Sequence, residues 1–139
     1  MYTILGKRTL AQGIREYVVE APLVAKAAKA GQFVVIRLHE RGERIPLTLA
    51  DWDPDRGTVT LVVQAVGKTT VELAERFHEG DSLADVVGPL GEPSEIKEYG
   101  TVACVAGGVG IAPIYPIARA LKRAGNRICL LYTSPSPRD

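Results

Sequence analysis

The sequence has only two cysteines among its 139 residues, and its 17 basic and 16 acidic residues nearly cancel. Two cysteines are too few for a disulfide scaffold or for a metal site of four thiolates. A net charge of +1 gives no reason to expect nucleic acid or an anionic membrane as a partner. The first residues also lack the apolar stretch of a signal peptide, so the expected location is cytoplasmic.

Long hydrophobic runs are also rare. Residues 101–118 carry no charge over a length that could span a membrane, but three glycines and two prolines interrupt them. This punctuation favours a strand, a turn and a helix, so no membrane partner is expected. The two histidines, His39 and His78, are far apart in the sequence, and the aspartates show no metal-loop spacing. The sequence therefore predicts neither a hydrolytic centre nor a metal site.

The first hundred residues contain short runs rich in β-branched and aromatic residues, separated by turn residues. Such spacing predicts strands of a closed barrel or a sandwich. The runs are Tyr2–Leu10, Ile14–Glu20, Phe33–Leu38, Pro46–Ala50, Gly57–Val66 and Leu83–Val87. A helix is expected over Val71–Phe77, because Thr69 and Glu72 have the spacing of a capping box.

After Gly100 the pattern changes to that of a parallel α/β domain. A buried strand is expected over Thr101–Ala106, a glycine turn over Gly107–Gly110 and a helix over Ala112–Ala124. Arg127 and Ile128 would open a second strand, which gives the start of a βαβ unit. We therefore expect two domains, residues 1–98 and residues 99–128.

The last eleven residues, 129–139, resemble the translation of a transposase adapter used in DNA library preparation. Read in one frame, the adapter gives Cys129 to Asp139 in order. We therefore expect a non-native tail over 129–139 and a native sequence that ends near Ile128, inside a domain.

Two segments have a pattern that suits an anionic ligand. In Val66–Val71 a glycine turn opens a capped helix, which exposes backbone N–H groups at the positive end of the helix dipole. In Ala106–Pro113 three glycines follow a buried strand and precede a helix, so a phosphate could approach the backbone. The second segment lacks the G-x-G-x-x-G spacing, which argues against a Rossmann site of the usual kind.

Three further segments complete a set: Ala30–Val34, Arg44–Asp51, and the Gly-Pro-Leu-Gly turn within Val87–Gly91. Together, and in this order, the segments resemble the ferredoxin–NADP reductase superfamily. The resemblance is strongest to its small FAD-binding electron-transfer subunits, of the NADH-dependent ferredoxin–NADP oxidoreductase or sulfide dehydrogenase type. The electron-transfer subunit of dihydroorotate dehydrogenase is a near relative of these. The fold that the resemblance implies is an antiparallel β-barrel that binds FAD, followed by the start of a parallel α/β nucleotide-binding domain.

The resemblance also implies roles for particular residues. Leu47 would pack against the flavin ring, and the Thr48 hydroxyl would lie near flavin N5. Arg44 would pair with the FAD pyrophosphate, although Ile45 occupies the slot where the family commonly has this arginine, and Pro46 follows. The other implied cofactor contacts are Val62, Val63 and Gln64 near the ribose and adenine; Gly67, Lys68, Thr69 and Thr70 at the pyrophosphate; and Gly107, Gly108, Gly110, Ile111, Ala112 and Pro113 at the nicotinamide nucleotide.

The implied activity moves reducing equivalents between NAD(P)H and an iron–sulfur partner. That partner would be ferredoxin or a larger iron–sulfur flavoprotein subunit. Intact relatives bind a [2Fe–2S] centre through C-terminal cysteines that are absent here, so the chain alone is expected to be inactive. The alternatives are a dihydroorotate dehydrogenase subunit, a flavin-binding barrel without turnover and a reductase of free flavin. The choice between NADH and NADPH stays open.

Overall fold

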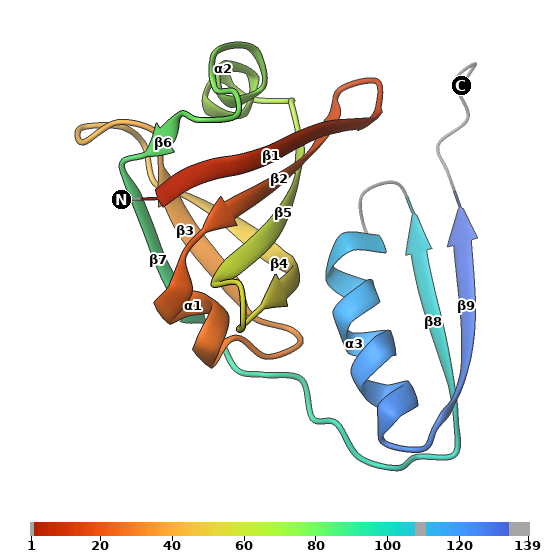
Figure 1. The fold of residues 1–139 in the computed structure, drawn as a ribbon. Helices are drawn as coiled ribbons and strands as arrows, with labels where there is room; N and C mark the ends of the chain where they lie inside the picture. The colour runs from red at the N-terminus through yellow and green to blue at the C-terminus, as the bar shows by residue number, and fades with distance from the viewer. Residues whose placement is uncertain (1, 108–110, 134–139) are drawn as a thin grey trace.

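The computed structural model describes residues 2–107 and 111–133 and shows a barrel beside a small α/β unit (Figure 1). The barrel strands are β1 (Tyr2–Ala11), β2 (Ile14–Glu20), β3 (Phe33–Arg37), β4 (Ile45–Asp53), β5 (Thr58–Gln64), β6 (Ser82–Leu83) and β7 (Asp85–Leu90). Two short helices, α1 (Pro22–Ala27) and α2 (Lys68–Arg76), lie at opposite ends of the barrel (Figure 1). The α/β unit consists of β8 (Thr101–Gly107), α3 (Ile111–Arg123) and β9 (Arg127–Thr133).

The seven barrel strands form one antiparallel sheet in the order β6-β1-β2-β5-β4-β3-β7. Together they make the nearly closed antiparallel barrel that the sequence predicted. Side chains alternate along β5, so that Val59, Leu61 and Val63 are at most 3% exposed. This period of two sends one face of every strand into a single core. The core also takes in Leu73 and Phe77 from the region of α2, which fixes that helix on the barrel.

Tyr17 of β2 is 2% exposed, and its hydroxyl has no hydrogen-bond partner among the described residues. Burial raises the pKa of this phenol from 10.0 to about 12, although nearby Arg15 acts in the opposite direction. Between these two values the unfolded chain loses the proton while the folded chain keeps it. Stability is therefore expected to fall as the pH rises from 10 to 12.

We expect Tyr17→Phe to remove this dependence. The difference between the unfolding free energies of the two proteins should change by on the order of 2 kcal/mol between pH 10 and pH 12. At pH 7 the variant should be about 1 kcal/mol more stable, because a buried hydroxyl without a partner is gone. Urea unfolding at pH 7, 10 and 11.5 measures both effects. An equal alkaline loss in the two proteins would contradict the assignment.

Lys7 of β1 fastens the far end of α2 to the barrel. Its ammonium group donates hydrogen bonds to the carbonyl oxygens of Ala74 at 2.6 Å and Phe77 at 2.8 Å. These carbonyls belong to the last turn of α2 and to the residue after it, which have no partners within the helix. The contact therefore ties β1 to the C-terminal end of α2, opposite the end that opens on the groove described below.

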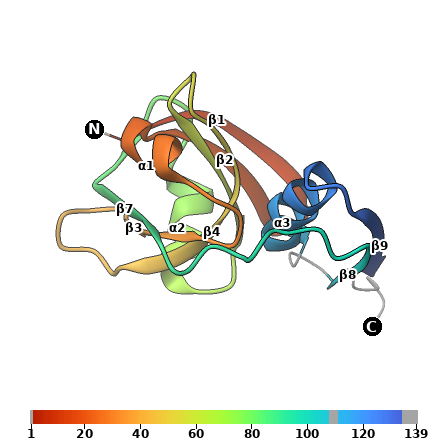
Figure 2. The same ribbon diagram turned by 90° about the horizontal axis from the view of Figure 1, so that it is seen from below.

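In the α/β unit, β8 and β9 pair in parallel and α3 connects them, which makes a βαβ unit. Helix α3 lies between this two-stranded sheet and the barrel, against β4 (Figures 1 and 2). The chain crosses from β7 to β8 through residues 91–100, which form no helix or strand, and the predicted boundary at residue 98 falls there. Strand β9 includes residues 129–133 of the predicted tail.

Asn126 joins this connecting segment to the α/β unit. Its side chain is buried, accepts hydrogen bonds from the backbone N–H groups of Tyr99 and Gly100, and donates to the carbonyl oxygens of Lys97 and Leu121 at 2.8 Å. One amide thus uses both its oxygen and its nitrogen to satisfy four backbone groups.

The sequence missed α1, a helix of six residues that has Pro22 in its first turn and no side-chain cap. It is held by Val24 and Ala25, which are buried in the core. Tertiary packing thus forms a helix that is too short to be stable alone. In the described ranges, no helix combines the length and the apolar character needed to cross a membrane.

Candidate functional site

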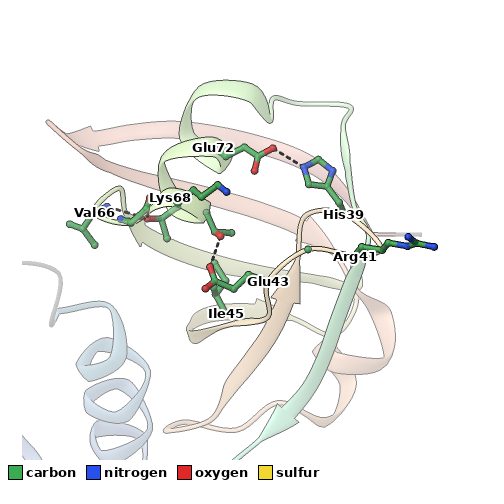
Figure 3. A pocket seen from close by; sticks show the side chains of 11 residues that line it. His39, Arg41, Glu43, Ile45, Val66, Lys68 and Glu72 are labelled. Atoms are coloured by element: carbon green, nitrogen blue, oxygen red, sulfur yellow. Dashed lines mark hydrogen bonds and ion pairs between the residues drawn. The ribbon is translucent and has the colours of Figure 1, made fainter.

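A groove with a volume of about 590 Å³ opens at the N-terminal end of α2 (Figure 3). Strand β4 contributes Ile45 to its lining, and the turn into α2 contributes Gly67, Lys68, Thr69 and Thr70. A third contribution comes from the loop between β3 and β4, with His39, Arg41 and Glu43. The structure thus brings parts of two of the predicted ligand segments to one place.

The turn into α2 is held by Thr70. Its Oγ1 accepts hydrogen bonds from the backbone N–H groups of Gly67 at 2.9 Å and Val66 at 3.1 Å, and it donates to the Gly67 carbonyl oxygen at 3.2 Å. Gly67 is the N-cap, so the predicted capping box of Thr69 and Glu72 is wrong by two residues. The reason is that Gly67 already has extended backbone and lets the helix begin at Lys68.

Three backbone N–H groups remain at the helix end, those of Lys68, Thr69 and Thr70. Within the described part of the chain none of them has an acceptor. Such groups, with the helix dipole behind them and the Lys68 ammonium beside them, form a site for an anion. This observation fits the phosphate groups of a dinucleotide.

Two carboxylates also face the groove (Figure 3). The Thr69 hydroxyl donates to Glu43 Oε1 at 2.5 Å, and Glu72 Oε2 lies 2.7 Å from His39 Nε2. The His39 ring also lies 5.6 Å from the ring of Phe77, which is itself in the core. The β3–β4 loop is thereby drawn over α2, and the residues that neighbour the groove hold one another in place.

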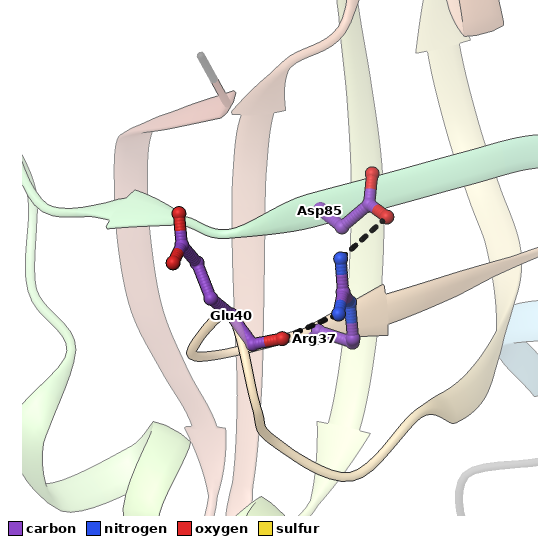
Figure 4. Close-up of polar contacts among 3 residues, drawn as sticks. All are labelled: Arg37, Glu40 and Asp85. Atoms are coloured by element: carbon purple, nitrogen blue, oxygen red, sulfur yellow. Dashed lines mark hydrogen bonds and ion pairs between the residues drawn. The ribbon is translucent and has the colours of Figure 1, made fainter.

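Arg37, at the end of β3, anchors the same loop from the other side (Figure 4). It donates to the carbonyl oxygen of Glu40, and its Nη2 lies 3.2 Å from Asp85 Oδ2 in β7. Within the loop the Gly42 N–H donates to the His39 carbonyl oxygen at 2.9 Å, which closes a turn. The loop therefore has a defined path between its two strands.

The remaining predicted residues of β4 lie next to the groove in sequence. Leu47 and Thr48 are half-buried and pair with Val34 and Phe33 of β3, whereas Pro46 is exposed. Leu47 also packs against the core. Arg44 is exposed and is not among the groove residues, whereas Arg41 is. The roles predicted for these residues stay predictions, and Arg44 has the least support from its position.

The predicted residues of β5 divide by face. Val63 is 3% exposed and belongs to the core, so its side chain is not available to a ligand. Val62 is half-buried, and Gln64 is exposed at the end of the strand. The exposed Val66 two residues later lines the groove; it opens the predicted segment Val66–Val71 but was not among the predicted cofactor contacts.

The predicted nucleotide turn is described only at its two ends. Gly107 is the last residue of β8, and Ile111, Ala112 and Pro113 form the first turn of α3. Gly108 and Gly110 lie outside the described residues. The strand and the helix therefore follow in the predicted order.

Residues 51, 52 and 119 make a contact that no pattern in the sequence predicted. Arg119 Nη1 of α3 lies 2.7 Å from Asp51 Oδ1 of β4, and its guanidinium carbon lies 5.4 Å from the centre of the Trp52 ring. The contact joins the barrel to the α/β unit.

Comparison with known proteins shows that the chain is similar to electron-transfer subunits of a dehydrogenase. An electron-transfer subunit homologue of dihydroorotate dehydrogenase B (NAD(+)) from Thermotoga maritima is 58% identical over 125 residues, which cover 90% of this chain and 44% of that protein. The electron-transfer subunit of the same enzyme from Shouchella clausii is 33% identical, over 91% and 50% of the two chains. The chain thus spans about half the length of these curated relatives.

Solved structures of electron-transfer proteins also match the chain. A structure of NADH-dependent reduced ferredoxin-NADP oxidoreductase, studied for flavin-based electron bifurcation, matches 98% of this chain with a TM-score of 0.95 and 53% identity, over 49% of its own length. Phthalate dioxygenase reductase, which transfers electrons from pyridine nucleotides to [2Fe-2S], matches with a TM-score of 0.79 and 25% identity, over 44% of its length. No protein-family profile matches the chain.

Proposed function

We propose that this chain, a homologue of flavin electron-transfer subunits with the ferredoxin reductase-like FAD-binding fold, binds FAD in the barrel and serves electron transfer from NAD(P)H. The single observation that carries the proposal is the groove at α2. There a predicted flavin strand and a helix end with three N–H groups lacking acceptors meet in one cavity. The second electron carrier is proposed to be an iron–sulfur protein, either ferredoxin or a larger subunit.

In this proposal the chain binds and orients the cofactor without acting as an acid or base. The N–H groups of Lys68, Thr69 and Thr70 would hold the pyrophosphate, with the Lys68 ammonium balancing part of its charge. Leu47 would offer an apolar surface to the flavin ring, and Thr48 a hydroxyl beside it. When bound, FAD itself supplies the hydride and single-electron chemistry.

Glu43 would have to yield part of its present position to the pyrophosphate. Its carboxylate accepts the Thr69 hydroxyl hydrogen at the helix end where the anion would lie. Two negative groups cannot share that end without repulsion. Because Glu43 is exposed and on a loop, it can turn toward solvent when the cofactor enters.

Titration of the purified chain with FAD, followed by flavin fluorescence, tests the proposal. We expect saturable binding, and we expect Thr70→Val to weaken it about tenfold, since the variant loses the side-chain cap that shapes the turn. Thr70→Ser keeps the hydroxyl and serves as the matched control. Titration with riboflavin, which lacks the phosphates, should show no difference between the two variants.

Absence of FAD binding by the unaltered chain would overturn the proposal. Equal FAD affinity of the valine and serine variants would show that the cofactor lies away from α2.

One alternative has support from a particular finding. The curated relatives described above include an electron-transfer subunit of dihydroorotate dehydrogenase B (NAD(+)) and a homologue of that subunit, so the partner of this chain could be a dihydroorotate-oxidising subunit instead of a ferredoxin system. Co-purification with each kind of partner, followed by flavin reduction in the mixture, separates the two.

A further inference from the structure

The barrel and the α/β unit meet at Asp51, Trp52 and Arg119. A β-bulge in β4 lies directly beside this contact. The pairing of β4 with β5 shifts register between Leu49 and Asp51, so two residues of β4 oppose one of β5. Leu49 and Ala50 are consequently both buried, although they are neighbours in the strand. A bulge of this kind re-aims the side chains that follow it. Here it turns Asp51 out of the barrel, toward α3.

The Asp51 and Arg119 side chains each make more than one interaction. Asp51 Oδ1 accepts the backbone N–H of Trp52 at 2.9 Å as well as pairing with Arg119. The Arg119 guanidinium lies over the indole ring while it reaches the carboxylate. A planar guanidinium can make both contacts at once, which an ammonium group on a flexible stem does less well.

Beside the contact of Asp51, Trp52 and Arg119, apolar side chains do not fill the space between the barrel and α3. Pro116 of α3 is fully buried, but a groove of about 440 Å³ remains, lined by Trp52, Pro54, Pro116 and Arg119 among others. Continuous apolar packing does not fill this part of the interface. The connecting segment 91–100, without helix or strand, would leave the two units free to change their relative position if nothing else held them.

We propose that Asp51, Trp52 and Arg119 form a latch that sets the orientation of the α/β unit against β4. Strand β4 carries Leu47 and Thr48, the predicted flavin face, and α3 begins at the predicted nucleotide turn. The latch therefore positions one cofactor segment relative to the other. These are positioning residues, and the consequence for electron transfer rests on the proposed function.

The chain has one tryptophan, so tryptophan fluorescence reports on the surroundings of Trp52 at this contact. We expect Arg119→Met to red-shift the emission of Trp52 and to raise its acrylamide quenching constant about threefold, because the ring loses its cover. Arg119→Lys should recover the ion pair but only part of the protection. Asp51→Asn should raise quenching less than Arg119→Met, and the double variant Asp51→Asn with Arg119→Met should add nothing to Arg119→Met alone.

Arg123→Met is the matched control, since Arg123 lies one turn further along α3 and lines the same groove. It should leave Trp52 quenching unchanged. Unchanged quenching in Arg119→Met, or an equal rise in Arg123→Met, would overturn the latch. Far-UV circular dichroism of each variant shows that α3 and the strands are intact.

These measurements are made without added flavin, so they do not depend on cofactor binding. FAD titration of Arg119→Met then separates the two proposals. We expect its affinity to stay within about twofold of the unaltered chain, because the phosphates are held at α2 and not at the latch. If no variant or parent binds FAD while the Trp52 results hold, the proposed function fails and the latch stands.

Discussion

Gly31→Ala should destabilise the protein by about 3 kcal/mol or more, because a methyl group at this position has no space and the wrong backbone. Gly31 has a φ of +91°, and a Cβ atom there would lie 2.9 Å from the backbone nitrogen of Ser94 and 2.3 Å from its Oγ. The Ser94 nitrogen cannot move away cheaply, since it donates a hydrogen bond to Ala30 at 2.9 Å.

Gly13→Ala is the matched control for this prediction. Gly13 also has a positive φ, +76°, but nothing lies within 4 Å of the added methyl group. We expect it to lose only about 1 kcal/mol, the backbone term alone. Urea unfolding of both variants gives the two free energies. Equal losses would show that the approach of Ser94 does not matter.

A second variant in the same background sharpens the test. Removing the side chain with Ser94→Gly should recover only part of the stability of Gly31→Ala, since the backbone nitrogen stays in place. The neighbouring Gln32 holds the same crossing, because its Nε2 donates to the Gly91 carbonyl oxygen at 3.0 Å. Gly31 and Gln32 together fix the start of the connecting segment on the barrel.

Asn126→Ala should cost about 4 kcal/mol of the stability of the α/β unit. The substitution removes the partners of four backbone groups, those of Lys97, Tyr99, Gly100 and Leu121, around a site that is 5% exposed. Each lost hydrogen bond contributes about 1 kcal/mol, and groups left buried without a partner cost more. Hydrogen exchange of β8 amides measures the change where it occurs.

Asn126→Asp distinguishes the two halves of this amide. The carboxylate can still accept from Tyr99 and Gly100, but it would face the carbonyl oxygens of Lys97 and Leu121 with no hydrogen to donate. We therefore expect a loss close to that of Asn126→Ala despite the nearly equal size. Protection of β8 amides in Asn126→Asp as strong as in the unaltered chain would contradict the importance of the donated bonds.

The order of the strands and helices, α1 excepted, could be predicted from the sequence because it depends on local patterns. β-branched runs, glycine turns and the strand–turn–helix after Gly100 carry their signal within ten residues or so. The fold class followed from these runs together with the resemblance. Features that depend on distant partners left no such signal. No pattern near Arg119 predicts its ion pair with Asp51. In the sequence, Asn126 is a polar residue after a helix, and nothing indicates its four hydrogen bonds.

The candidate site shows the same division. Gly67 to Thr70 were predicted from a turn that opens a helix, and the structure brings this turn to the groove with Ile45. Val63, in contrast, was predicted as a contact from its place in a motif, while its side chain lies in the core. Successive side chains of a strand point to opposite faces, so Val62 and Val63 cannot both face a ligand, and the pairing of β5 with β2 sends Val63 into the core.

The hydrogen bonds from Lys7 to the C-terminal end of α2 change the electrostatic field in the groove at its other end. A free helix presents a positive pole at one end and an equal negative pole at the other, and the two partly cancel at a distance. Here the ammonium group of Lys7 sits on the carbonyl oxygens at the negative pole. A ligand in the groove therefore meets something closer to a single positive pole than to a dipole. A helix of nine residues can in this way attract an anion more strongly than its length alone would suggest.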